Sequence, residues 1–191
     1  MNMLRLAALT LDHHDDLRGP MPTTGGMRPG PVDAIPAPGF ARRVGARPVA
    51  IRIPAIQVDT DVETARIVDG VMQDPSGPWI VAWYSQTSRV GVPGNAVFAG
   101  HLDYYGVGPA VFWRLRELLP GDVIEITGNT GLLYRYRVEW VRAFDTGTAP
   151  VAEIVGPTTT ESVTLITCGG TFDAARGEYD QRVVVRAVRI R

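Results

Sequence analysis

The chain contains a single cysteine, Cys168, which ends the apolar run 163–168 and is followed by two glycines. A run rich in β-branched residues predicts a strand, and the glycines allow the backbone to turn so that the sulfur faces a groove. His101 follows a second apolar run, and Arg182 opens a third, at 182–185. A thiol, an imidazole and a guanidinium beside strand-like runs predict covalent catalysis at a carbonyl.

The three groups have complementary chemistry. The thiolate is the nucleophilic form of cysteine, and ordinary pKa values of about 8.5 for Cys and 6.5 for His leave roughly 1% of molecules with thiolate and imidazolium together near pH 7.5. The His101 imidazolium of such a pair can protonate a leaving amine. Arg182 cannot act as a base, so we expect it to donate hydrogen bonds to an oxyanion or to substrate carbonyls.

Each residue also has a plainer interpretation. Taken alone, Cys168 is a buried small hydrophobic residue and His101 a loop or core histidine. Arg182 has two competitors: Arg176, which lies in a segment that resembles a loop, and Arg186, which shares its strand face by alternation. We favour Arg182 from its position relative to the cysteine.

Asp103 is a candidate for a supporting role behind His101. It lies two residues further on and would point the same way on a continuous strand. A turn or capping role is the alternative. No other Asn or Asp stands out in the sequence as a partner that would orient the imidazole.

Composition limits the possible functions. The 191 residues carry a net charge of −1, which does not indicate a nucleic-acid partner, and suffice for one well-filled domain. All 19 cationic residues are arginines, so lysine nucleophiles are excluded. One cysteine makes neither an internal disulfide nor a cysteine-rich zinc site. His13-His14 beside Asp15-Asp16 is interpreted as solvated, and we expect no metal and no cofactor.

No apolar stretch reaches the roughly 18 residues of a membrane span. The nearest candidate, Met3–Leu11, contains Arg5 and is not a convincing signal peptide. From the sequence we expect a soluble chain.

The chain divides near residue 47. Up to that point it is rich in Gly and Pro and lacks periodicity, so we predict a flexible N-terminal arm at 1–47 and one folded domain at 48–191. We predict strands at 49–53, 58–62, 96–99, 123–127, 133–144, 162–168 and 182–190, with a further apolar run at 79–83. Val111–Leu119 has the best helical pattern, and Val151–Val155 is a possible helical turn. Many short strands with one or two short helices predict an all-β dominated barrel or sandwich.

The motifs resemble those of the sortases. The resemblance covers roughly Pro48 to Arg191 and rests on the chain order and spacing of three motifs: Gly100-His101, Thr164-Leu165-Ile166-Thr167-Cys168, and an arginine opening the last strand. It implies a closed eight-stranded barrel in which Cys168, His101 and Arg182 converge. It also implies a cysteine transpeptidase, which cleaves a Leu-Pro-x-Thr-Gly-like sorting signal between Thr and Gly and transfers the thioester to a cell-wall amine.

Within the family, Gly100-His101-Leu102-Asp103 and Cys168-Gly169-Gly170-Thr171-Phe172-Asp173 look most like class F, with class E second. The implied partners are surface proteins with a C-terminal sorting signal and a peptidoglycan precursor or other amine. The implied location is the extracytoplasmic face of a bacterial membrane. The resemblance also implies a membrane anchor, for which we expect no segment in the sequence given.

Two rival functions remain open at this point. The site could mainly hydrolyse its thioester, as a cysteine endopeptidase, or the barrel could bind peptide without turnover, with Cys168 buried and unreactive. Met21-Pro22-Thr23-Thr24-Gly25 has the form of a sorting motif with Met in the first position. Such a pentad arises readily by chance in a Pro/Thr/Gly-rich segment, and the alternative is a pseudosubstrate.

Overall fold

The computed structural model describes residues 44–190. Residues 1–43 of the predicted arm, including the pentad 21–25 and the histidines at 13 and 14, lie outside the described residues. In chain order the structure contains the following elements: β1 (Pro48–Ile53), η1 (Pro54–Ile56), β2 (Val58–Ala65), β3 (Ile67–Val68), β4 (Val71–Met72), β5 (Val81–Tyr84), β6 (Gly94–Ala99), β7 (Asp103–Tyr104), β8 (Gly108–Pro109), η2 (Leu115–Glu117), β9 (Val123–Gly128), β10 (Leu133–Asp145), α1 (Val151–Val155), β11 (Glu161–Asp173) and β12 (Glu178–Ile190).

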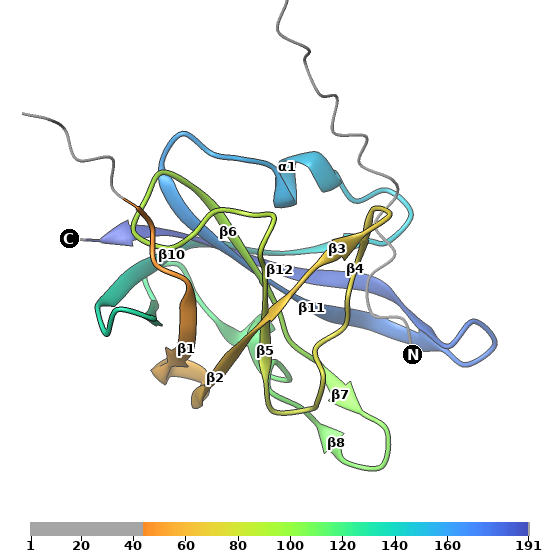
Figure 1. Ribbon diagram of the computed structural model, residues 1–191. Helices are drawn as coiled ribbons and strands as arrows, with labels where there is room; N and C mark the ends of the chain where they lie inside the picture. The colour runs from red at the N-terminus through yellow and green to blue at the C-terminus, as the bar shows by residue number, and fades with distance from the viewer. Residues whose placement is uncertain (1–43, 191) are drawn as a thin grey trace, which may run out of the picture.

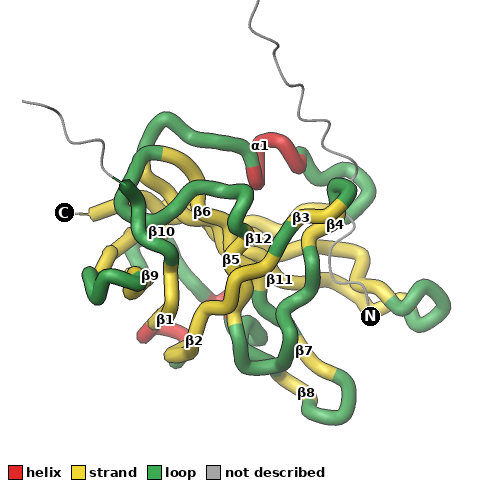
Figure 2. Tube along the Cα trace, in the orientation of Figure 1, coloured by secondary structure: helices red, strands yellow, loops and turns green. Residues whose placement is uncertain are grey.

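Eight of these strands close a barrel in the order β1-β2-β5-β6-β11-β12-β10-β9. Figures 1 and 2 show that strands and loops make up nearly all of the molecule, with α1 lying over one side of the barrel. The pairs β2–β5 and β6–β11 are parallel, and the other barrel pairs are antiparallel. The predicted all-β fold and the closed eight-stranded barrel are confirmed.

Alternation along the strands separates two apolar clusters. Residues such as Phe98, Leu165 and Val185 point into the barrel and form its interior. Their sequence neighbours, among them Ala99 and Val184, point outward and form a second cluster with Ile154 of α1. The outer face of β6, β11 and β12 is therefore covered rather than solvated, which explains why these strands have continuous apolar runs.

The helix predicted at Val111–Leu119 is wrong. Only the 3₁₀ turn η2 forms there. Phe112, Leu115 and Leu118 are buried and spaced three residues apart, which is the repeat of a 3₁₀ helix, while Leu119 is exposed. The predicted turn at Val151–Val155 is confirmed as α1.

Candidate functional site

Cys168 lies on β11, on the outer face of the barrel. It follows Thr164 and Ile166 in the outward alternation, and its side chain is 6% exposed. The strand was expected to end at the cysteine, but it continues to Asp173 through a register shift between Gly169 and Phe172. Gly170 permits this bulge: its φ is +76°, and a Cβ there would lie 2.0 Å from the carboxylate of Asp180.

The pairing of β6 with β11 brings His101 to the same face. The two strands run parallel, with Ala99 opposite Ile166, so the residues that follow β6 emerge beside the part of β11 that carries Cys168. The Gly100 amide donates to the Ile166 carbonyl at 3.2 Å, and the Thr167 hydroxyl donates to the Gly100 carbonyl at 2.8 Å. Both bonds hold the chain just before His101 against the middle of the strand that carries the thiol.

Gly100 is required by close packing. A Cβ at this position would lie 2.5 Å from the ring of Phe112, which is fully buried inside the barrel. The glycine therefore allows the chain to pass over the barrel end immediately before His101.

The contacts of His101 determine which ring nitrogen can exchange a proton with substrate. Nε2 lies 3.0 Å from the Pro75 carbonyl oxygen, and a carbonyl only accepts, so Nε2 carries a proton and donates it. In the neutral ring Nδ1 then holds the lone pair, so it is the nitrogen that can accept a proton. The Tyr104 ring packs edge-on against the imidazole, with centroids 5.1 Å apart.

The loop that supplies the Pro75 carbonyl connects β4 to β5 and is held at several points. Glu63 on β2 accepts hydrogen bonds from the Ser76 amide and hydroxyl, at 2.6 and 2.7 Å. The Tyr84 hydroxyl donates to the Gln73 carbonyl at 2.7 Å. These bonds fix the carbonyl that orients His101.

Arg182 lies directly opposite Cys168 across the β11–β12 pair. It is 6% exposed, and its Nη1 donates to the carbonyls of Tyr179 and Gln181 at 3.0 and 2.8 Å. These two bonds hold the guanidinium close to its own strand, beside the thiol.

The two competing arginines have other partners. Arg176 is largely exposed in the predicted loop and faces Asp173 at 3.6 Å. Arg186 shares the outer face with Arg182 but donates to the carbonyls of Glu153 and Ile154 in the α1 segment.

Burial raises the pKa of the Cys168 thiol to about 11. The nearby Arg182 guanidinium opposes this by lowering the pKa, whereas the carboxylates of Asp103, Asp74 and Glu178 raise it further. At neutral pH the resting site therefore holds a protonated thiol.

Asp103 lies on β7 and not on a continuation of β6, so the simple alternation expected from His101 does not apply. Its carboxylate accepts a hydrogen bond from the Tyr179 hydroxyl at 2.5 Å, and the pKa of Tyr179 rises to about 12, first through burial and then through this bond. Tyr179 in turn packs against Phe172, with ring centroids 5.2 Å apart. Asp103 thus links β7 to the β11–β12 hairpin.

A cavity of about 400 Å³ opens beside the thiol, and we call it the cysteine cavity. It is lined by apolar side chains, the backbone around the bulge, and a few polar groups. The lining residues are Leu102, Phe112, Trp113, Arg116, Ala143, Thr167, Cys168, Gly169, Gly170, Tyr179, Gln181 and Val183.

The sequence analysis did not identify Pro75, Tyr104, Tyr179 or Asp74 as part of the site. Pro75 acts through a backbone carbonyl, which no side-chain pattern reports. Tyr179 lies three residues before Arg182, so a longer β12 would have placed it near the site. Over residues 44–190 no group of three or more His, Cys, Asp or Glu side chains is gathered for metal binding. The same residues contain no helix with the length and apolarity to span a membrane.

Comparison with known proteins agrees with this architecture. The fold is similar to the sortase D5 transpeptidase of Clostridium perfringens, with 22% identity over 77% of this chain and 79% of that one and a TM-score of 0.56. It is also similar to sortase C-1 of Actinomyces oris (21%, 75% and 73%, TM-score 0.59) and sortase A of Listeria monocytogenes (20%, 77% and 88%, TM-score 0.56). At these identities the likeness shows the fold alone.

No curated protein matches the chain. The sortase domain family, however, matches residues 51–190. This range includes β5, β6, β11 and β12, and with them His101, Cys168 and Arg182. The chain therefore belongs to the sortase family of cysteine transpeptidases.

Proposed function

We propose that this protein cleaves a Leu-Pro-x-Thr-Gly-like sorting signal between Thr and Gly and transfers the acyl group to a cell-wall amine. The observation that carries the proposal is the register of β11 with its two neighbours. It sets Arg182 directly opposite Cys168, and the β6 pairing delivers His101 to the same outer face. In this proposal Cys168, His101 and Arg182 are the catalytic residues.

Acylation begins from the minor thiolate–imidazolium state. The thiolate of Cys168 attacks the threonine carbonyl, and N–H groups of Arg182 stabilise the oxyanion. Nδ1 of His101 gives its proton to the leaving amine while Nε2 stays bonded to the Pro75 carbonyl. The products are a Cys168 thioester and neutral imidazole, which can later accept a proton from the entering amine.

The raised thiol pKa makes the reactive state rare in the resting enzyme. Because few molecules hold the thiolate, acylation is slower, but the thiol is protected from unrelated electrophiles. A bound substrate excludes water and places its carbonyl against Arg182. Both effects change the electrostatic environment of the sulfur.

The proposal also assigns a sortase class, the bounds of the catalytic domain and a location. Class F is favoured over class E by the motifs that begin at Gly100 and Cys168, and Asp103 of the first motif has a structural partner in Tyr179. We assign the catalytic domain to residues 48–191. The partners are surface proteins that bear a sorting signal and a peptidoglycan precursor, met at the extracytoplasmic face of a bacterial membrane, where sortases act.

The test is incubation with a Leu-Pro-x-Thr-Gly peptide series, in which x and the first residue vary, with triglycine as acceptor. Mass spectrometry follows the peptide products and the intact protein, and Cys168→Ala is the control. We expect cleavage after Thr, an acceptor-linked product and an acyl adduct that requires Cys168. Cleavage without ligation at any acceptor would favour the endopeptidase. Folded protein that forms no adduct with any peptide would contradict the proposal and favour the non-catalytic binding barrel.

A further inference from the structure

A groove with two exposed tryptophans lies beside the cysteine cavity. It has a volume of about 440 Å³, within the roughly 300–1,000 Å³ of small-molecule sites. Trp79 and Trp113 both line it, and they are 58% and 40% exposed. Two large apolar rings in solvent gain free energy from a contact, so they mark this groove as a binding surface.

We propose that this groove, here called the tryptophan groove, binds a neutral pyranose oligosaccharide. A pyranose with equatorial hydroxyls has an apolar face of axial C–H groups, which packs on an indole, and a rim of polar hydroxyls. Ile56, Val58 and Val111 add further apolar lining beside the two rings. The site goes beyond the proposed function, because it binds its ligand without turnover.

Gln57, Asp59 and Arg114 supply the polar groups that sugar hydroxyls require. An amide both donates and accepts, a carboxylate accepts from two hydroxyls, and a guanidinium donates through several N–H groups in one plane. Gln57 and Asp59 are exposed, and Glu117 holds Arg114 in place through an ion pair of 2.8 Å. Because the lining contains one acidic and one basic side chain, it favours a neutral, hydroxylated ligand over an ion.

Hydrogen bonds tie together the segments that carry the two tryptophans. The Thr60 hydroxyl donates to the Trp79 carbonyl at 2.5 Å, and the Val111 amide, two residues before Trp113, donates to the Pro78 carbonyl at 2.9 Å. The groove is therefore formed before a ligand arrives, which limits the ordering cost of binding. The same bonds occupy backbone carbonyls that an added peptide strand would use, so recognition depends on side chains, which favours a sugar over such a peptide.

The tryptophan groove is continuous with the cysteine cavity, because Trp113 lines both. His101, Cys168 and Arg182 do not line the tryptophan groove, so a saccharide bound there leaves these groups free. A glycan held by the groove therefore keeps the thiol close to the polymer that carries the sugar.

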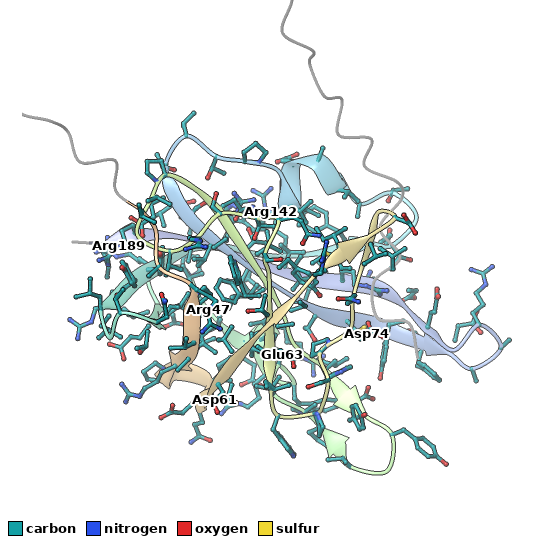
Figure 3. All side chains as sticks on the ribbon, viewed as in Figure 1. Arg47, Asp61, Glu63, Asp74, Arg142 and Arg189 are labelled. Carbon is teal, nitrogen blue, oxygen red and sulfur yellow. The ribbon has the colours of Figure 1, made fainter. Side chains whose placement is uncertain are left out.

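Calorimetric titration of the protein with tri-N-acetylchitotriose tests the proposal. We expect saturable binding, which Trp79→Ala weakens about tenfold through the loss of one stacked ring and Asp59→Asn weakens severalfold through the loss of one charge-assisted hydrogen bond. Tyr105→Ala is the matched control for the tryptophan, because Tyr105 is 93% exposed and does not line the groove. Asp61→Asn is the matched control for Asp59, because Asp61 is exposed on the same strand and lies outside the lining (Figure 3).

Binding to Cys168→Ala separates this site from the proposed transpeptidase. We expect the saccharide to bind Cys168→Ala as it binds the wild type, whether or not sorting peptides form an acyl adduct. No binding, or equal affinities within each pair of variant and control, would overturn the saccharide site, and the aspartate pair decides the outcome if Trp79→Ala does not fold.

Titration of Cys168→Ala with a Leu-Pro-x-Thr-Gly peptide tests the competing occupant. We expect Trp79→Ala, introduced into this background, to leave the affinity for the peptide within about twofold, because Trp79 does not line the cysteine cavity. A variant that loses affinity for the peptide and keeps its affinity for the saccharide would assign the tryptophan groove to the sorting signal and contradict the proposal.

Discussion

The reactivity of Cys168 depends on opposing effects that act on one buried atom. Burial and three carboxylates favour the thiol, and Arg182 favours the thiolate. Because the raised pKa keeps the proton on sulfur in the folded protein, thiolate accumulates only as the pH approaches about 11.

We therefore expect alkylation of Cys168 by iodoacetamide to accelerate about tenfold per pH unit throughout the range 7 to 10. Unfolding the protein in guanidinium should lower the midpoint to the ordinary cysteine range, near 8.5. Measuring alkylation rates against pH by mass spectrometry is straightforward because the chain has no second thiol. A plateau below pH 9 in the folded protein would show that burial does not control the thiol.

Arg182 provides a second prediction at this scale. Replacing Arg182 with Gln removes a nearby positive charge that lowers the thiol pKa, so alkylation at pH 8 should slow severalfold. Arg176→Gln is the matched control, since Arg176 is exposed and paired with Asp173. Equal rates in the two variants would mean that Arg182 does not act on the sulfur.

Sequence reasoning singled out Cys168, His101 and Arg182 because each carries its chemistry in its side chain and borders an apolar run of the sequence. It did not reach Pro75, whose carbonyl orients His101, because any residue supplies a carbonyl. One of the two interpretations of Asp103 required a continued β6, whereas the chain leaves that strand at Ala99 and returns as β7. Where the chain bends between two strands is decided by tertiary packing, which alternation does not report.

At the scale of elements, α1 is attached to the barrel by buried polar groups. The Ile154 carbonyl accepts from Asn95 at 3.1 Å and from Arg186 at 2.9 Å, and Asn95 also donates to the Gly156 carbonyl. The Thr164 hydroxyl donates to the Asn95 side chain at 2.7 Å. Ile154 and Val155 belong to the same outer apolar cluster as Cys168. The helix therefore covers part of the outer face of the barrel, and a polar network fixes it there.

This attachment predicts a stability difference between two asparagines. Asn95→Ala removes three buried hydrogen bonds and should lower the free energy of unfolding by about 2–3 kcal/mol. Asn129→Ala removes one bond at an exposed turn, from the Arg47 amide, and should cost under about 1 kcal/mol. Urea denaturation measures both, and a similar loss in the two variants would contradict the fixed attachment of α1.

The strands and helical turns show what sequence periodicity can and cannot predict. The strands were found because alternation and β-branched runs are local properties, and α1 was found from a short apolar turn. The segment 111–119 was mistaken for a helix because buried residues every third position fit a helical face nearly as well as a 3₁₀ turn.

At the scale of the molecule, one interior cluster contacts every barrel strand, so the domain should unfold as a unit. Leu165→Ala removes a fully buried side chain from this interior and should destabilise the protein by about 2–5 kcal/mol. Leu119→Ala, at a side chain 67% exposed, should change stability by less than about 0.5 kcal/mol. Thermal unfolding followed by circular dichroism tests both, and two separate transitions would contradict a single cooperative interior.

The position of β12 in the barrel has a consequence for synthesis. It is the last barrel strand in chain order, yet it lies between β10 and β11 and pairs with both along most of its length (Figure 1). A nascent chain that ends before residue 178 exposes the unpaired edges of two 13-residue strands, which are templates for misassembly. Cys168 is thus translated before the strand that brings Arg182 opposite it, so this pair forms only when the final strand inserts between β10 and β11.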